Sequence, residues 1–231
     1  MSYKWLLLWF EAPLQSWGAD SKFDRRDTLK FPTKSGVYGL LLSAMGASGE
    51  QKELLEKLSS MEMQVISYKK ENEKNLLLID YHTVGGGYDS DDDWETLHIP
   101  KKSDGDKPVG QGNKITYRYY LQNAKFGIVL QIPIELKDSI DQSLKNPKYH
   151  IYLGRKNCTP TDMVFRGFYD TKEDALKELQ KISKEKELKE EFEVLEGKKE
   201  GDESFYINDV PIQFGKFKKY KDRLITIIKK T

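Results

Sequence analysis

The stretch from Lys4 to Phe10, KWLLLWF, marks the centre of the predicted β-sheet, because every residue after the lysine is apolar. A strand with one solvated face alternates apolar and polar residues, whereas an unbroken apolar run indicates a strand buried on both faces. We therefore expect this segment to be a central strand. Glu11 and Pro13 follow at once, so the run is too short to span a membrane, and no signal-peptide cleavage pattern accompanies it.

The rest of the chain alternates between helical and strand periodicity. Helices are predicted over Ser35–Met45, Glu50–Leu58, Leu136–Leu144 and Thr171–Ser183. The first is capped by Thr33 or Ser35 and stopped by Gly46, and the last is capped by Thr171. Further strands are predicted over Met63–Tyr68, Leu76–His82, Ile115–Leu121, Phe126–Ile132, Met163–Tyr169, Phe205–Phe214 and Leu224–Ile228. This order indicates an α+β protein, and a ferredoxin-like core with an inserted loop fits it.

Two segments have no sustained period. Residues 84–112 hold six glycines and an acidic run, and a loop of that length is uncommon unless it is functional or disordered. Residues 184–202 are rich in charge, so we expect a surface segment. The total of 231 residues suits one domain with a sizeable core, or one domain with a small appendage.

Charge and cysteine content limit the function classes. The 38 Lys and Arg residues are matched by 37 Asp and Glu residues, for a net charge of +1. A free-standing, non-specific nucleic-acid binder is usually strongly basic, so near-neutrality instead favours a local basic track on a subunit of a larger assembly. With Cys158 as the sole cysteine, no internal disulfide forms, which indicates a cytoplasmic protein.

Two segments have the residue types that hold a nucleic-acid strand. Tyr152–Pro160, YLGRKNCTP, combines a stacking ring, a glycine turn and two adjacent cations, Arg155 and Lys156, which we expect to contact phosphates. Phe31–Gly36, FPTKSG, is a polar loop that opens into a helix, where free backbone N–H groups can accept a phosphate. We expect the fold to bring both segments to a single nucleic-acid strand.

Two further cationic segments leave alternatives open. In the predicted strand TYRYYL, Arg118 and Tyr120 share one face, so Arg118 either lines a groove or belongs to an ordinary half-buried strand. The pair Arg25 and Arg26 stands between aspartates and is either a solvated charge cluster or part of a binding surface.

Several catalytic and metal sites are excluded by spacing. An acidic run at residues 89–93 begins like a calcium loop, but Trp94 and Pro100 stand where glycine and glutamate are required. Gln111 replaces the lysine of a P-loop. The three histidines lack metal-ligand spacing, and a Cys158–His150 pair has no third residue to support it. His82, at a strand end, is more often a structural hydrogen-bonding residue than a catalyst.

Five motifs in order carry a family resemblance. They are APLQSWG at 12–18, FPTKSG at 31–36, DYHTV at 80–84, TYRYYL at 116–121 and YLGRKNC at 152–158. Together they resemble CRISPR-associated Cas family five, in its type I-E branch, the Cascade subunit that caps the 5′ end of CRISPR RNA. The resemblance runs from about Tyr3 to Tyr169.

This resemblance implies a single RAMP domain over residues 1–231, a relative of the RRM, with a ferredoxin-like core and a thumb loop within 84–112. The body would hold the RNA 5′ handle, and the thumb would meet the adjacent backbone subunit of Cascade. The large PAM-reading subunit would dock nearby, and target DNA would be reached through the complex. No catalytic residue, metal, cofactor or membrane contact is implied. The implied RNA-binding residues are Gln15, Ser16, Trp17, Arg25, Arg26, Lys34, Ser35, Arg118, Tyr152, Gly154, Arg155 and Lys156.

The alternative is catalytic. In the type I-C branch the related protein cuts precursor RNA without a metal, using a tyrosine and an adjacent lysine and histidine. Here Ile115 follows Lys114 and no lysine is followed by histidine anywhere in the chain. Tyr38 and His98 could be combined into a catalytic site only by assumption, and a base would have to be His82 or His98. The sequence therefore favours a non-catalytic role over an endoribonuclease. A scaffold that binds only proteins would leave the clustered cations unexplained.

Overall fold

The computed structural model describes residues 2–18, 24–74, 76–84, 91 and 114–230. Most of the predicted thumb therefore lies outside the described residues. The described chain forms a smaller four-stranded sheet and a seven-stranded sheet, in which the strands lie in the order β10 (Glu203–Gln213), β11 (Lys219–Lys229), β9 (Lys189–Glu196), β4 (Met63–Lys69), β7 (Lys125–Pro133), β1 (Tyr3–Glu11) and β8 (Phe165–Tyr169).

Strand β1 (Tyr3–Glu11) lies inside the large sheet. It pairs antiparallel with β7 (Lys125–Pro133) on one side and with β8 (Phe165–Tyr169) on the other. All five side chains from Leu6 to Phe10 are fully buried. The apolar run thus forms the central, doubly covered strand that its sequence predicts.

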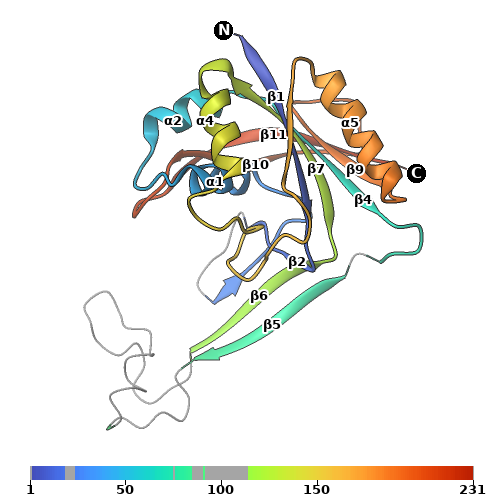
Figure 1. The fold of residues 1–231 in the computed structure, drawn as a ribbon. Helices are drawn as coiled ribbons and strands as arrows, with labels where there is room; N and C mark the ends of the chain where they lie inside the picture. Colours follow the sequence, from blue (N-terminus) through green and yellow to red (C-terminus); the bar gives the residue numbers. More distant parts are fainter. Residues whose placement is uncertain (1, 19–23, 75, 85–90, 92–113, 231) are drawn as a thin grey trace.

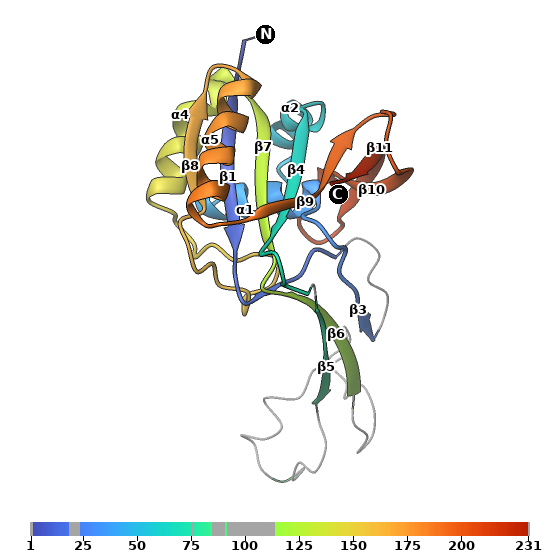
Figure 2. The same ribbon diagram turned by 90° about the vertical axis from the view of Figure 1, so that its right-hand side faces the viewer.

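Helices cover both faces of this sheet (Figures 1 and 2). On one face α1 (Lys34–Met45), α2 (Lys52–Ser59) and α4 (Ile134–Lys145) share a hydrophobic core with Leu6, Leu8 and Phe10. On the other, α5 (Lys172–Glu185) packs against Leu7 and Trp9. The antiparallel sheet with helices on each face confirms the α+β class.

The helix ends follow the predicted chemistry. Thr33 caps α1, its Oγ1 accepting a hydrogen bond from the Gly36 amide, and Gly46 ends the helix with φ of 71°. Thr171 caps α5 by accepting from the Asp174 amide. These positions were predicted because hydroxyl side chains satisfy free N–H groups and glycine adopts left-handed backbone without strain.

The prediction of a charged surface segment over residues 184–202 is wrong in part. The segment contains β9 (Lys189–Glu196), which pairs with β4 (Met63–Lys69) and with β11 (Lys219–Lys229) inside the large sheet. Its carboxylates are neutralised by partners distant in sequence, as when Glu196 accepts from Arg223 of β11 at 2.8 Å. The partners come from distant sequence, so local charge alone could not reveal the strand.

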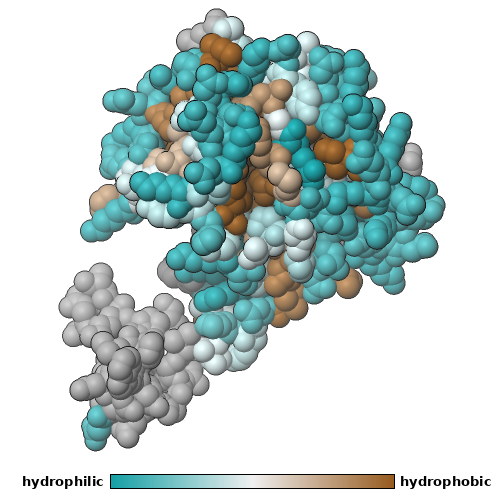
Figure 3. Space-filling model, in the orientation of Figure 1, coloured by the Kyte–Doolittle hydropathy of each residue, from teal (hydrophilic) through white to brown (hydrophobic). Residues whose placement is uncertain are grey.

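The smaller sheet is built around β6 (Lys114–Gln122). Strands β2 (Leu14–Gln15) and β3 (Arg25–Arg26) pair with β6, and β5 (Leu77–Val84) pairs with it antiparallel from Leu77↔Leu121 to Val84↔Lys114. Together β5 and β6 form a ribbon that projects from the body (Figures 1 and 2). The visible face of the body is mostly hydrophilic, with a hydrophobic patch beside the base of this ribbon (Figure 3).

The remaining large strand, β10 (Glu203–Gln213), forms a hairpin with β11 at one edge of the large sheet. This hairpin contacts α1 and α2. Among the described helices, none is long and apolar enough to cross a membrane.

Candidate nucleic-acid interface

Three arginines from three separate segments gather on one face of the small sheet. Arg26 of β3 is the parallel register partner of Arg118 of β6, so the two project from the same face. Arg155 joins them, with its guanidinium carbon 4.6 Å from the centre of the Tyr120 ring. Tyr120 shares a strand face with Arg118. We call Arg26, Arg118 and Arg155 the arginine cluster.

The Arg155 guanidinium bridges the two strands that carry the other arginines of the cluster. One nitrogen donates to the Arg26 carbonyl at 2.6 Å and another to the Tyr119 carbonyl at 3.3 Å. Stacking on Tyr120 adds a cation–π contact. Arg155 therefore holds β3 against β6. The side chain predicted to contact a phosphate is thus the same one that fixes these two strands together. Lys156 beside it is exposed.

Like charges opposite each other on neighbouring strands are destabilising unless something offsets them. Within the residues that the structure describes, no ion pair involves Arg25 or any member of the arginine cluster. Asp80 is the β5 register partner of Arg118 but forms no ion pair with it. The cluster therefore presents positive charge to its surroundings, which suits a polyanion such as RNA.

Gly154 fixes the loop beside this cluster. Its φ is +99°, and a Cβ at this position would lie 1.8 Å from the Ser16 carbonyl oxygen. The two backbones also bond directly, because the Ser16 amide donates to the Leu153 carbonyl at 3.2 Å. The predicted forced turn is therefore present, and only glycine fits it.

A cleft of about 430 Å³ opens next to Gly154. Its wall is continuous with the arginine cluster, because the Ser16 hydroxyl and Arg155 donate to the same Tyr119 carbonyl. The cleft combines small, hydroxylated, aromatic and cationic residues from α1, the 150–154 loop and the β10–β11 hairpin. Its lining is Ser16, Trp17, Gly18, Thr33, Ser35, Gly36, Gly39, Leu40, Ser43, His150, Tyr152, Gly154, Phe214, Lys218 and Tyr220.

The fold thus brings the two predicted segments, 31–36 and 152–160, to one cleft. The start of α1 is only partly free for an anion, however. The Lys34 amide donates to the Asp209 carboxylate at 2.7 Å and the Gly36 amide to Thr33, so side chains of the protein already satisfy both. Among the described residues the Ser35 amide has no acceptor, and the Ser35 hydroxyl donates to Thr33. The expectation of a fully open phosphate site at this helix is corrected accordingly.

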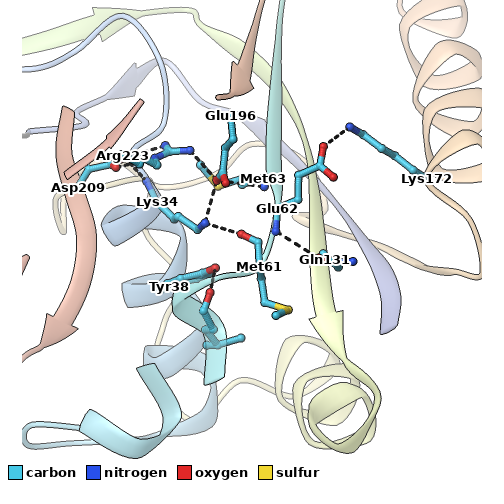
Figure 4. Close-up of polar contacts among 11 residues, drawn as sticks. Lys34, Tyr38, Met61, Glu62, Met63, Gln131, Lys172, Glu196, Asp209 and Arg223 are labelled. Atoms are coloured by element: carbon cyan, nitrogen blue, oxygen red, sulfur yellow. Dashed lines mark hydrogen bonds and ion pairs between the residues drawn. The ribbon is translucent and has the colours of Figure 1, made fainter. Parts of the chain in front are cut away.

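The Lys34 side chain points toward Met61 and Glu196 (Figure 4), and Lys34 is not among the residues that line the cleft. It is 1% exposed, donates to the Met61 carbonyl and pairs with Glu196 at 2.8 Å. Burial lowers the pKa of its ammonium group, opposed by the Glu196 carboxylate. Arg223 binds the same Glu196 and also Asp209. We call Lys34, Glu196, Asp209 and Arg223 the buried ion-pair network, and Lys34 is a structural residue of it.

Gln15 and Trp17 are likewise internal. Trp17 is 1% exposed and stacks on Phe10 at a centroid distance of 5.4 Å, so its faces are not open to a base. Its Nε1–H donates to Gln15, whose amide donates to the Ala124 carbonyl at 2.7 Å. Gln15, Trp17 and Lys34 therefore support the cleft from within the core, because their side chains already have partners there. The predicted stacking ring that remains accessible is Tyr152, half-buried at the cleft.

Sequence reasoning missed the C-terminal wall of the cleft. Phe214, Lys218 and Tyr220 lie at or near the turn between β10 and β11, and all three line the cleft. The signal was the run GKFKKYK at residues 215–221, in which cations alternate with aromatic residues. Its distance in sequence from the other motifs hid its place in the fold.

The candidate residues for RNA cleavage are either poorly placed to contact RNA or lie outside the residues that the structure describes. The Tyr38 hydroxyl is buried, donates to the Leu58 carbonyl at 2.6 Å and has a pKa raised by burial. His82 lies on β5 opposite Thr116. His98 is outside the described residues. In the part of the chain that is described, no group of histidine, cysteine and carboxylate side chains could hold a metal ion.

The ribbon has a second face with different chemistry. Leu77, Ile79 and Tyr81 alternate along β5 and are 51%, 53% and 56% exposed. Tyr81 meets Tyr117 of β6 edge to face at 5.5 Å. An exposed apolar row on a projecting ribbon is typical of a surface that contacts another protein.

Fold and site define a class: an α+β protein with antiparallel sheets, whose arginine cluster lies beside a cleft lined by aromatic and polar residues. The sequence profile of the family described as CRISPR-associated protein (Cas_Cas5) matches residues 5–221. The chain belongs to this family.

Individual relatives agree. The chain is 27% identical over 175 residues to the CRISPR system Cascade subunit CasD of Escherichia coli (strain K12), covering 71% of this chain and 70% of that protein. A chain of a solved CRISPR RNA-guided surveillance complex has a TM-score of 0.74 at 24% identity, over 97% of this chain and 89% of that one. A crystal structure of a Cas protein has a TM-score of 0.62 at 24% identity, over 96% and 93%.

Proposed function

We propose that this protein is a non-catalytic RNA-binding subunit of a type I-E CRISPR surveillance complex, Cascade, and acts in antiviral defence. It holds and caps the 5′ handle of the CRISPR RNA. It also bridges the backbone subunits to the large PAM-reading subunit, and it reaches target DNA only through the assembled complex.

The topology of the large sheet supports a ferredoxin-like RAMP core. The elements β1, α1, β4, β7, α4 and β8 follow each other in the chain, with the β5–β6 ribbon inserted between β4 and β7. Their four strands lie in the order β4-β7-β1-β8, and every neighbouring pair is antiparallel. That is the strand order of a split βαβ pair, the ferredoxin-like arrangement.

The observation that carries the proposal is the arginine cluster, which forms no ion pair among the described residues and is continuous with a cleft of about 430 Å³. Sequence-independent holding of a single strand needs a cationic track for phosphates and rings for bases. Arg26, Arg118, Arg155 and Lys156 supply the track, and Tyr152 supplies a ring. Arg25, whose register partner is Tyr117, lies on the opposite face of the small sheet and is not part of this track. Ser35 and Gly154 supply a polar wall that the RNA backbone can approach closely. Ser16, also predicted to contact RNA, is only 4% exposed and its hydroxyl donates to the Tyr119 carbonyl, so it supports this wall instead.

The β5–β6 ribbon supports the bridging role. The ribbon carries an apolar row on one face and Arg118 on the other, so it can contact a protein and an RNA at the same time. We propose that it forms the base of the thumb and contacts the adjacent backbone subunit.

Co-purification tests the proposal. A tagged full-length chain is expressed in its own host, purified under native conditions, and its bound nucleic acid is sequenced. We expect CRISPR RNAs that share one repeat-derived 5′ end, together with other Cascade subunits. Recovery of Cascade subunits without RNA would remove the handle-binding role.

A cleavage assay tests the non-catalytic part. The purified chain is incubated with repeat RNA in the presence of chelator, from neutral to mildly alkaline pH, and no specific cut is expected. A single cut that disappears in a His82→Ala or His98→Ala variant would instead favour the metal-independent endoribonuclease of the type I-C branch.

A further inference from the structure

The β10–β11 hairpin and the 150–154 loop both line the cleft. Phe214 and Tyr220 of the hairpin region are half-buried and Lys218 is exposed, while Tyr152 and His150 line the cleft from the loop. The His150 and Tyr152 rings are 6.4 Å apart between centroids. Aromatic rings on two walls with a cation at the rim are the groups that hold an unpaired base and its phosphate.

The floor between these walls is open. Gly39 of α1 lines the cleft, and a Cβ built on it would meet no atom within 4 Å. Gly36, one turn earlier, lies directly over Trp17, since a Cβ there would be 2.8 Å from that ring. The volume of about 430 Å³ falls within the range of pockets that enclose one small molecule.

From this geometry we propose that the cleft is a pocket for one unpaired nucleotide of the bound RNA, and that the β10–β11 hairpin supplies its second wall. Tyr220 contacts the base and Lys218 contacts a phosphate. This inference rests on the proposed RNA-binding function and assigns a binding role to the C-terminal part of the chain. The arginine cluster, which shares the Ser16 wall, would hold the neighbouring phosphates.

The experiment uses the full chain and synthetic repeat-derived RNAs that carry the fluorescent base 2-aminopurine at successive positions, since stacking on an aromatic ring quenches this base. We expect one position to be strongly quenched. Tyr220→Leu should restore its fluorescence and weaken binding about tenfold, whereas Tyr220→Phe, which keeps the ring, should not. Lys218→Gln should flatten the log–log salt slope by ~0.7.

Gly39→Leu places a larger side chain in the cleft from α1 and leaves the residues of the hairpin and of the 150–154 loop unchanged. Leucine favours helix over glycine, and the space above Gly39 is empty, so the variant should fold at least as stably as the parent. We expect it to remove the quenching. Matched controls on the same hairpin are Tyr206→Leu, at a side chain 73% exposed outside the cleft lining, and Lys221→Gln; both should behave as the parent.

The outcomes separate this inference from the proposed function. If the parent chain binds RNA but the Tyr220, Lys218 and Gly39 variants keep its affinity and fluorescence pattern, the pocket is overturned and the RNA-binding function stands. If the variants lose a co-purifying protein while RNA binding is unchanged, the cleft holds a protein segment and the inference is also overturned. If the parent binds no RNA, the proposed function fails and the pocket fails with it.

Discussion

The protein contains two groups of cations that its fold treats in opposite ways. In the buried ion-pair network, Lys34 and Arg223 are almost fully buried and share Glu196, and Arg223 also pairs with Asp209 (Figure 4). In the arginine cluster, Arg26 and Arg118 lie side by side on paired strands, and among the described residues neither forms an ion pair. Both groups look alike in the sequence, as short cationic motifs beside turns.

The contrast between paired and unpaired cations shows which of them are available to bind a ligand. A buried charge is tolerated only with a partner, so removing the partner is costly. An exposed charge gains little from a partner, so leaving it unpaired costs little and keeps it free for a ligand. The buried network therefore serves the fold, and the arginine cluster serves binding.

The largest effect should come from breaking the buried network with Asp209→Ala. The Asp209 side chain has no exposed surface, and its loss leaves Arg223 with Glu196 alone and the Lys34 amide without an acceptor. We expect the free energy of unfolding to fall by about 3–5 kcal/mol, measured by urea denaturation. Asp222→Ala, at an exposed residue on the same hairpin, is the control and should change it by less than about 0.5 kcal/mol. A loss below about 1 kcal/mol for Asp209→Ala would show that the network is dispensable.

Next in size is Gly154→Ala, which acts on the junction between the cleft and the arginine cluster. Alanine is strained at φ of +99°, and its Cβ would collide with the Ser16 carbonyl, so the loop must move. We expect a loss of roughly 2 kcal/mol in unfolding free energy, together with weaker RNA binding. Gly197→Ala is the comparison, because its φ is +81° but nothing lies within 4 Å of the added Cβ. Equal losses in the two variants would mean that contact with Ser16 is unimportant.

A third variant sharpens the comparison by removing charge where no partner exists. Arg26→Gln combined with Arg118→Gln should leave the unfolding free energy unchanged or slightly raised, because two like charges are removed. RNA affinity should fall, and the log–log salt slope should flatten by ~0.7 for each lost phosphate contact. The double variant Lys177→Gln with Lys181→Gln, on α5 across the sheet, should keep the parent slope. An unchanged slope in the arginine variant would contradict a role for the cluster in binding.

The smallest effect concerns pH. Burial lowers the pKa of Lys34 below its usual 10.5, so in the window beneath 10.5 the unfolded chain binds more protons at this site than the folded chain. Stability must then rise with pH through that window and level off above it. The difference in unfolding free energy between the parent and Lys34→Met should therefore increase as the pH approaches 10.5 from below. A difference that stays flat or decreases would show that Lys34 titrates normally.

Much of the fold could be predicted because its signals are local. The apolar run of β1, the Thr33 and Thr171 caps and the Gly46 stop each depend on a few neighbouring residues. Strand β9 could not be predicted, since its carboxylates are neutralised by Lys34, Arg223 and Lys230 from far along the chain. A local window contains the charges of this strand but not the partners that allow it into the sheet.

The candidate site divides in the same way. The sequence identified Gly154, Tyr152 and the arginines as residue types suited to binding a nucleic-acid strand. The order of the five sequence motifs identified the family. It also assigned Gln15, Trp17 and Lys34 to the RNA, and the structure places these side chains in the core. Residue type shows what a side chain is able to contact, whereas burial decides whether it is accessible.

By itself, then, the sequence determined the α+β class, the central strand, the helix ends and the family, because each depends on local pattern or on motif order. Only the tertiary structure decided which cations are paired and which are free. It alone also decided that the β10–β11 hairpin meets α1 and the 150–154 loop around one cleft. Pairing and enclosure depend on distances in space between residues far apart in the chain, and such distances are fixed only when the sheet and its helices pack together.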